Sequence, residues 1–418
     1  MEKLGTAILE GYDKVNPVSV EEYIKIGGFQ GLKNALEISS QEICDEIKKS
    51  NLKGRGGAAY PTGIKWEQAY QVENNPKYIL CNGDEGEPGT FKDKIIFERI
   101  PLKLIEGMTI AAKVLGANIG YIYIRGEYAY LQQIVKDAID NAKSAGYLGD
   151  NILGTGLSFD IKVLTGAGGY VVGENSALVE SSEGKSGRPR MKPPYIKISG
   201  LFKMPTLVNN VETFAAVSYI MKNGGETFRK LGNEESGGTK IICLSGNVKN
   251  RGVYEVPFGI TLREIIYDIG KGIENGRPLK AVQIGGSSGS IIPATMIDTP
   301  LCYEAFKKAR ITLGSGSILV LDDSVSMIEF LKYVYGFFLH ESCGKCTPCR
   351  EGNKQLNNII DRLYNGEATK EDLNKMNKII SAMKSASFCG LGKSAPTALE
   401  CCLKYFKDEI LMGLRGEN

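Results

Sequence analysis

The sequence predicts three consecutive regions: an α/β region with a mostly parallel sheet, a small β-grasp-like α+β region, and an α-helical region at the C-terminal end. Three observations carry this prediction. Short apolar segments alternate with helical patterns up to about residue 235, which is the order typical of a parallel α/β fold. A hairpin, a helix and a further strand are expected within 239–322, and the pattern from residue 326 onward is helical. The predicted domains are therefore 1–235, 239–322 and 326–418.

In the first region, the alternation of elements is regular. We expect helices over 42–50, 103–113 and 129–144, and strands over 78–81, 120–124 and 159–164. The last of these strands runs directly into a glycine-rich turn, after which a helix can begin near residue 174. The region ends at 232–238, a polar, glycine-rich stretch of the kind that links domains.

The second and third regions follow a different order. In the second we expect strands over 240–245, 253–256 and 281–284, with a turn at 249–252 and a helix near 262–269. In the third we expect helices over 328–340, 352–365, 370–383 and 395–411. Thr369 stands before an acidic first turn, Glu371 and Asp372, as is typical of a helix N-terminus.

Composition excludes several classes of function. The 418 residues include 51 basic and 48 acidic ones, so charge gives no case for nucleic acid as a partner. No stretch of about 18 apolar residues occurs, so we expect no direct membrane insertion. Residues 1–14 carry no signal-peptide pattern, which favours a cytoplasmic location. Ten cysteines in such a chain argue against a disulfide framework.

Four of these cysteines form the strongest motif. Cys343, Cys346 and Cys349 are spaced C-x2-C-x2-C within ESCGKCTPC at 341–349, and Cys389 follows alone. Three thiols at this spacing can wrap one face of a cubic cluster and a distant fourth can close it, which indicates a [4Fe–4S] cluster. A zinc site usually pairs two C-x2-C knuckles, so zinc and free thiols remain as alternatives. We interpret the other six cysteines as small buried hydrophobes.

The sole histidine, His340, stands just before this motif. A ligand or proton-carrier role is one interpretation. The other, which we favour, is a cation at the end of the preceding helix, where it suits the helix dipole. With one histidine, histidine-based nucleophilic triads are nearly excluded.

Glycine-rich and acidic loops indicate a phosphate-bearing ligand. The loop at 54–63 matches G-x-G-x-x-A, but no strand precedes it and Pro61 interrupts an immediate helix, so a phosphate loop and a plain linker remain equal interpretations. The loop at 165–170 follows a strand and precedes a helix, which is the geometry that offers N–H groups to a nucleotide. The acidic loop at 82–89 could bind a metal, act as a general acid, accept bonds from sugar hydroxyls or form a solvated turn.

Together these segments resemble the NADH-binding flavoprotein subunit of respiratory complex I, and equally the β-subunits of electron-bifurcating hydrogenases and NAD-dependent formate dehydrogenases. The resemblance covers nearly the whole chain. It rests on GRGGAAYPTGIKW at 54–66, CNGDEGEPGTFKDK at 81–94, TGAGGYVVGEN at 165–175, KPPY at 192–195, PTLVNNVET at 205–213 and the cysteine motif. It implies an α/β flavin domain, a β-grasp-like domain and a helical iron–sulfur domain, with FMN, a [4Fe–4S] cluster and NAD(H) or NADP(H) as substrate.

The resemblance also implies site residues. Those that would hold FMN are Gly54, Gly56, Lys65, Asn82, Asp84, Glu174, Asn209, Asn210 and Thr213. Those that would contact the dinucleotide are Gly57, Tyr60, Glu85, Glu87, Tyr170, Lys192 and Tyr195. No side chain need act as acid or base, because the flavin N5 takes the hydride and electrons then pass singly to the cluster at Cys343, Cys346, Cys349 and Cys389.

Three departures from the family pattern fall on the dinucleotide side: Ala59-Tyr60 in place of Gly-Phe, Gln68 in place of an aromatic, and Asn175 in place of a glutamate. We expect Asn175 to remove a repulsion of the 2′-phosphate and so to favour NADP(H). The alternative is that Asn175 only hydrogen-bonds the ribose of NAD.

The resemblance finally implies partners. Bifurcating relatives often carry thioredoxin-like and ferredoxin-like terminal domains, and this chain has neither. We therefore expect a thioredoxin-fold [2Fe–2S] subunit and a further catalytic or ferredoxin-linked subunit, with bifurcation left open. The rival class of function is a non-catalytic iron–sulfur conduit without dinucleotide chemistry, which the full set of flavin motifs disfavours.

Overall fold

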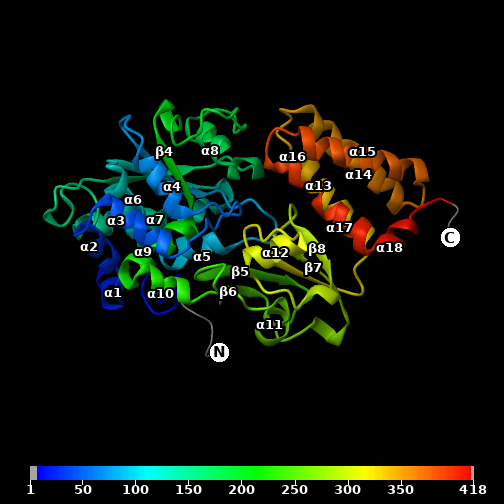
Figure 1. Ribbon diagram of the computed structural model, residues 1–418, viewed down its shortest axis with the longest axis horizontal. Helices are drawn as coiled ribbons and strands as arrows, with labels where there is room; N and C mark the ends of the chain where they lie inside the picture. Colours follow the sequence, from blue (N-terminus) through cyan, green and yellow to red (C-terminus); the bar gives the residue numbers. More distant parts are fainter. Residues whose placement is uncertain (1–6, 416–418) are drawn as a thin grey trace.

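The computed structural model describes residues 7–415, so Met1 to Thr6, at the start of the segment in which no export signal is expected, lie outside the described part. Figure 1 shows the first region in blue to green, the second sheet in yellow-green and yellow, and the helical region in orange and red. The strands are β1 (Tyr78–Gly83), β2 (Ile119–Ile124), β3 (Asp160–Thr165), β4 (Thr206–Asn210), β5 (Thr239–Gly246), β6 (Gly252–Pro257), β7 (Leu279–Ile284), β8 (Ser290–Pro293) and β9 (Ser317–Asp322).

Helices connect and cover these strands. They are α1 (Val20–Lys25), α2 (Gln30–Leu36), α3 (Ser40–Lys49), α4 (Thr62–Tyr70), α5 (Lys92–Arg99), α6 (Pro101–Leu115), α7 (Gln132–Ser144), α8 (Asn175–Ser182), α9 (Val211–Asn223), α10 (Gly225–Lys230), α11 (Leu262–Glu264), α12 (Tyr303–Ala309), α13 (Met327–Glu341), α14 (Thr347–Tyr364), α15 (Lys370–Ala386), α16 (Gly390–Ser394), α17 (Thr397–Tyr405) and α18 (Lys407–Leu411).

The first sheet is parallel throughout and has the order β3-β2-β1-β4. After β1, the strands β2 and β3 are added on one side of β1, and β4 then pairs with its other side. In an open parallel sheet, ligands bind at the carboxyl ends of the strands where the order reverses in this way. Here that point lies between β1 and β4, where Asn82 stands opposite Asn210 in register.

Two buried helices support this sheet. Pro101 opens α6, a position where its missing N–H costs nothing. The helix packs against α9 so closely that a Cβ on Gly107 would lie 2.0 Å from the carbonyl oxygen of Phe214. Glycine is therefore required at this crossing, and the carboxyl end of β4, which leads directly into α9, is held firmly in place.

The second sheet is mixed, with the order β6-β5-β9-β7-β8. Its central strands β5 and β9 run parallel, while the flanking pairs are antiparallel. The strands expected over 240–245, 253–256 and 281–284 are confirmed as parts of β5, β6 and β7. The helix expected near 262–269 begins as α11, which is capped by Thr261 and Glu264, and continues as a π-helix over Ile265–Ile269.

The helical region packs on both sheets, because its apolar core includes residues 171–179 of the first region and one face of the second sheet. Thr369 caps α15, as expected, through a capping box with Asp372. The single helix expected over 395–411 is wrong. Pro396, which lacks an N–H, separates α16 from α17, and Phe406 leaves helical geometry at φ −129° before α18. Between residues 7 and 415, no helix is long and apolar enough to cross a membrane.

Candidate functional site

A cavity of about 390 Å³ lies at the carboxyl ends of β1 and β4, and all three regions of the chain line it. The first region supplies the glycine loop, the acidic loop and the turn before α8. The second supplies two turns, and the third supplies the start of α16. The lining residues outside the predicted set include Ala58, Thr90, Lys92, Asp93, Gly285, Ser288, Thr312, Gly314, Ser315, Gly390 and Leu391. Cys389, one of the predicted cluster ligands, also lines it.

The structure brings nine of the predicted flavin and dinucleotide residues to this cavity. They are Gly56, Gly57, Asn82, Asp84, Glu85, Glu87, Tyr170, Glu174 and Asn210. The others lie behind its wall or outside it. They are Gly54, Tyr60, Lys65, Asn175, Lys192, Tyr195, Asn209 and Thr213.

The glycine loop is anchored at its base. Gly54 N donates to the carbonyl oxygen of Tyr60 at 2.9 Å, which closes the loop. Gly57 has φ +119°, and a Cβ on Gly56 would lie 3.0 Å from the Asn210 Cβ, so both positions favour glycine. The expectation that Pro61 prevents an immediate helix is wrong: α4 begins at the next residue, because the φ of −58° at Pro61 suits a helix start.

Arg55, inside this loop, does not face the cavity. Its side chain is 1% exposed and donates to the Tyr303 hydroxyl at 3.2 Å and the Gly237 carbonyl at 3.1 Å. The guanidinium also lies 4.8 Å from the centre of the Phe258 ring. Arg55 therefore fastens the loop to the second region and leaves the backbone of the loop to face the cavity.

The acidic loop is buried at Asp84 and Glu85, half-buried at Glu87 and exposed at Pro88 and Gly89, so its first part does not fit the interpretation as a solvated turn. Burial raises the pKa of Asp84 to about 7, and its Oδ2 is buried with no hydrogen-bond partner among the described residues. Burial also raises the pKa of Glu85 to about 7, although its carboxylate accepts the Asp93 N–H at 2.9 Å and the Tyr128 hydroxyl at 3.2 Å. Two cavity carboxyl groups therefore titrate near neutral pH.

Glu87 joins the first region to the second. Its carboxylate accepts the Tyr170 hydroxyl at 2.5 Å and the Ser288 hydroxyl at 2.9 Å. Burial raises the pKa of Glu87, whereas these two hydrogen bonds act to lower it. Sequence reasoning missed Ser288, because no local motif marks it and only the fold brings it to the acidic loop.

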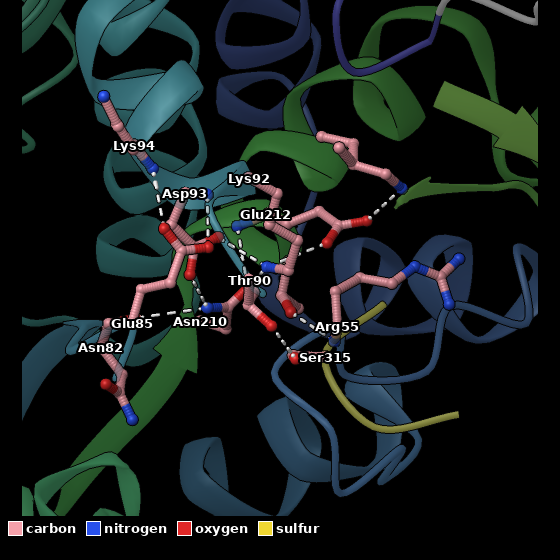
Figure 2. A network of polar contacts seen from close by, with 12 residues as sticks. Arg55, Asn82, Glu85, Thr90, Lys92, Asp93, Lys94, Asn210, Glu212 and Ser315 are labelled. Atoms are coloured by element: carbon pink, nitrogen blue, oxygen red, sulfur yellow. Dashed lines mark hydrogen bonds and ion pairs between the residues drawn. The ribbon is translucent and has the colours of Figure 1, made fainter. Parts of the chain in front are cut away.

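A buried ionic network includes the cavity-lining residues Lys92 and Asp93, and Figure 2 shows them with Asn210 and Glu212. The Lys92 ammonium lies 2.6 Å from Asp93, 3.0 Å from Glu212 and 3.1 Å from the Asn210 side-chain oxygen. Lys240 on β5 completes the network at 2.6 Å from Glu212. All four ionic side chains are at most 3% exposed, so each charge depends on its partners.

This network changes the interpretation of Asn210. Its side-chain oxygen accepts from Lys92, and its nitrogen donates to Asp93 Oδ2 at 2.6 Å and to the Asn82 carbonyl at 3.4 Å. These contacts engage both the oxygen and the nitrogen of the Asn210 side chain. They hold the side chain in place as part of the cavity wall. Thr213 is used similarly: its hydroxyl accepts the Arg55 N–H at 2.9 Å.

Lys65 contacts β4 and Asn209 belongs to it, and both side chains have hydrogen-bonding capacity that the described chain does not use. The Lys65 ammonium donates to the Val208 carbonyl, and no carboxylate among residues 7–415 pairs with it. Burial lowers the pKa of Lys65 to about 8. Asn209 is 5% exposed, and its side-chain nitrogen has no partner in the described chain. A cation without a carboxylate partner and a buried amide donor without a partner in the described chain fit an anionic, oxygen-rich ligand.

The start of α8 carries Glu174 and Asn175. The Glu174 carboxylate caps the helix by accepting the N–H groups of Ser176 at 2.9 Å and Ala177 at 3.0 Å, and it pairs with Lys192 at 2.6 Å. Although burial opposes it, this hydrogen bonding lowers the pKa of Glu174. Asn175 is the first residue of the helix.

The outermost predicted residues are exposed. Tyr60 is 46% and Tyr195 is 55% exposed, and neither lines the cavity. The Tyr60 hydroxyl donates to the Gln68 side-chain oxygen at 3.3 Å, and Lys197 donates to the same oxygen at 2.9 Å. Two of the departures from the family pattern, Tyr60 and Gln68, are therefore in contact with each other.

The four motif cysteines line a second, smaller pocket next to the cavity. The Phe388 N–H lies 3.4 Å from the Cys346 sulfur, and the Asn353 amide lies 3.4 Å from the Cys349 sulfur. Burial raises the pKa of Cys349 to about 11. In the described residues, no three His, Cys, Asp or Glu side chains are arranged to hold a single metal ion.

Cys389 lines both this thiol pocket and the larger cavity. A group bound in the cavity and a cluster bound by the thiols would share a wall.

His340 lies in the last turn of α13, as the helix-end interpretation expects, and does not line the thiol pocket. All ten cysteines are free, and Cys44, Cys81, Cys243, Cys302 and Cys402 are buried as expected, whereas Cys401 is half-buried.

Comparisons with known proteins agree with this geometry. Residues 47–219 match the family model of the Nuo51 FMN-binding domain, and residues 329–412 match that of the NADH-ubiquinone oxidoreductase-F iron–sulfur binding region. The first match contains both glycine loops and the acidic loop, which favours the phosphate-loop interpretation over a linker. The second contains all four motif cysteines, which decides for an iron–sulfur cluster over zinc.

Two relatives and one solved structure illustrate the similarity. The chain is 42% identical over 395 residues to NADP-reducing hydrogenase subunit HndC of Solidesulfovibrio fructosivorans, covering 94% of this chain and 80% of the relative. It is 44% identical over 386 residues to an NADH-quinone oxidoreductase F-type subunit of Rhizobium meliloti, covering 92% of each. A chain of NAD+-reducing [NiFe]-hydrogenase in the H2-reduced state matches with a TM-score of 0.87 and 33% identity, covering 100% of this chain and 68% of that one.

Proposed function

Because the chain belongs to the family of F-type NADH-quinone oxidoreductase subunits and their NAD(P)-linked hydrogenase relatives, we propose that it exchanges hydride with NAD(P)(H) on bound FMN and moves electrons singly to and from a [4Fe–4S] cluster. The observation that carries this proposal is Cys389, which lines both the large cavity and the thiol pocket. When bound, FMN supplies the conversion between a two-electron hydride and single electrons.

The residues present fit FMN. Lys65 offers an ammonium that donates to a carbonyl but has no carboxylate partner in the described chain. Asn209 offers a buried amide donor and Asp84 a buried carboxyl oxygen, both unsatisfied within the described chain. The glycine loop brings its backbone close without side-chain obstruction. Buried polar groups without partners cost free energy, so a ligand that satisfies them is bound with a corresponding gain.

The dinucleotide is proposed to lie over the flavin, towards Glu85, Glu87 and Tyr170. These three side chains line the cavity, and the Tyr170–Glu87 hydrogen bond fixes the ring of Tyr170. The same proposal assigns contacts to Gly57, which also lines the cavity, and to Tyr60, Lys192 and Tyr195 beyond it. The role of these residues is to orient the substrate, because the chemistry requires no protein acid or base.

We also propose the division into domains. A flavin domain over 1–235, a β-grasp-like domain over 239–322 and a helical cluster domain over 326–418 are supported by the two separate sheets and by the order β6-β5-β9-β7-β8. The irregular segment between α10 and β5 supports the first boundary.

Cofactor analysis tests the proposal. Protein purified without oxygen should release FMN in acid and contain about four irons with acid-labile sulfide. NADH or NADPH should bleach the flavin absorption. Finding FAD, or no flavin beside an intact cluster, would contradict the flavin assignment, and the second result would support the electron-conduit alternative. Stoichiometric zinc without iron would contradict the cluster.

Asn175→Glu tests the choice of dinucleotide. We expect the substitution to lower the ratio of kcat/KM for NADPH to that for NADH by about tenfold, because a carboxylate at the start of α8 would repel a 2′-phosphate by roughly 1.4 kcal/mol after screening. Asn175→Gln keeps the neutral amide and is the control. An unchanged ratio in Asn175→Glu would show that Asn175 does not set the preference.

The proposed partners are a thioredoxin-fold [2Fe–2S] subunit and a further catalytic or ferredoxin-linked subunit. Support comes from HndC and the other relatives, which are named as subunits, and from the single set of cluster cysteines in this chain. We place the complex in the cytoplasm, because all ten cysteines are free thiols. Native mass measurement should show heteromers, whereas a monomer with full physiological turnover would contradict the proposal.

A further inference from the structure

We propose that Lys345 sets the reduction potential of the cluster, acting as a fixed cation at the rim of the thiol pocket; this inference rests on the proposed cluster. Lys345 lies between Cys343 and Cys346 in the chain and lines the same pocket as the four thiols. Its ammonium donates to the carbonyl oxygen of Pro189, another residue of the pocket wall.

The ring of Phe388 fixes the ammonium from a second side. The Lys345 Nζ lies 4.4 Å from the centre of this ring, within the range of a cation–π contact. The Phe388 N–H in turn lies 3.4 Å from the Cys346 sulfur. The residue that holds the cation therefore also contacts a cluster ligand, and it directly precedes a second ligand, Cys389.

The acceptor, Pro189, is itself held firmly. The next residue, Arg190, donates its N–H to the Ser176 hydroxyl at 2.9 Å, and its guanidinium forms ion pairs with Glu180 and with Glu183, the latter at 3.2 Å. This segment belongs to the first region, whereas Lys345 belongs to the third. The cation is thus placed by the packing of the two regions and not by its own loop alone.

No carboxylate pairs with Lys345 in the described chain, so its charge is available to the cluster. Arg350, the other nearby cation, is different. It pairs with the carboxylate of Glu351 at 3.1 Å, and it does not line the thiol pocket. Glu341, the nearest acid before the motif, is occupied by the Tyr170 N–H at 2.8 Å. Lys345 is therefore the cation of this loop that faces the thiols without compensation.

The sign of the effect follows from charge. Four thiolates make the ligated cluster anionic, and reduction adds a further negative charge. A neighbouring cation stabilises the reduced form more than the oxidised form, and so raises the midpoint potential. The outer side of Lys345 is exposed to solvent, so salt should weaken the effect.

The test is a redox titration of the cluster in the cofactor-loaded full chain, followed by its EPR signal, after iron content is measured. Lys345→Gln should lower the midpoint potential, and its difference from wild type should shrink as ionic strength rises. Lys345→Arg should titrate close to wild type. Lys354→Gln, which removes an exposed lysine of α14 outside the thiol pocket, is the matched control and should leave the midpoint unchanged.

An unchanged midpoint in Lys345→Gln with full iron content would overturn the inference and assign Lys345 a purely structural role. If Lys345→Gln loses its iron, Phe388→Leu decides, because it frees the ammonium while keeping its charge: a lowered midpoint supports the inference and an unchanged one overturns it. A wild-type chain without iron would instead contradict the proposed cluster, which keeps the two failures distinct.

Discussion

Cys389→Ser is expected to abolish electron transfer to one-electron acceptors while NAD(P)H still reduces the bound flavin. Cys389 is the proposed cluster ligand that also lines the large cavity, so its loss should leave no cluster next to the proposed flavin site. Hydride transfer needs only the cavity, which the substitution leaves otherwise intact. The measurements are iron content, flavin bleaching by NAD(P)H and turnover with a one-electron dye.

The matched control for this variant is Cys401→Ser. Cys401 is a half-buried thiol of α17 that does not line the thiol pocket, so this variant should keep about four irons and full dye turnover. Full dye turnover in an iron-free Cys389→Ser protein would show that electrons leave the flavin without the cluster.

Lys65→Met is expected to weaken FMN binding by about tenfold to a hundredfold, which corresponds to roughly 1.5–3 kcal/mol for a lost hydrogen bond to a charged group. The affinity of the wild-type protein should also depend on pH. Burial holds the pKa of Lys65 at about 8 in the flavin-free protein, and an anionic ligand beside the ammonium would raise it. The affinity for FMN is then at its full value below pH 8, and it falls as the pH rises through the higher pKa that Lys65 has in the FMN-bound protein.

Lys77→Met is the control for this experiment. The Lys77 ammonium likewise donates to carbonyl oxygens, those of Ala69 at 3.3 Å and Tyr70 at 2.7 Å, but Lys77 stands just before β1, at the end of the strand opposite the cavity. Burial lowers the pKa of Lys77 as well. Equilibrium dialysis between pH 6 and pH 10 should separate the two variants; equal FMN affinities in both would remove Lys65 from the flavin site.

The parts of the fold that sequence predicts well are those that local patterns encode. The cysteine spacing, the strand that leads into the acidic loop and the cap at Thr369 each depend on a few consecutive residues. The strand β4, which carries Asn210, is not among the predicted strands. The break of the last predicted helix at Phe406 had no such signal, because phenylalanine is compatible with a helix and only packing takes it out of helical geometry.

The missed site residues depend on tertiary structure. Ser288 donates a hydrogen bond to Glu87 across about 200 positions of sequence. Lys240, on β5 of the second sheet, pairs with Glu212, which lies on α9 of the first region. Lys92 stands inside a quoted motif, yet its role is visible only once Asp93, Glu212 and Asn210 surround it. The motif places Asn210 at the cavity, and the contacts add that its side chain also bonds to Lys92 and Asp93; its role toward FMN stays a prediction.

The cavity wall drawn from three regions has a consequence for biogenesis. A nascent chain that has emerged only as far as β4 already carries the glycine and acidic loops, yet it still lacks Ser288, Ser315 and Cys389, which complete the enclosure. Flavin retention is therefore a property of the finished protein and cannot precede synthesis of the C-terminal helices. Since Cys389 lines both pockets, the wall between the proposed flavin and cluster sites is completed only once residue 389 is in place.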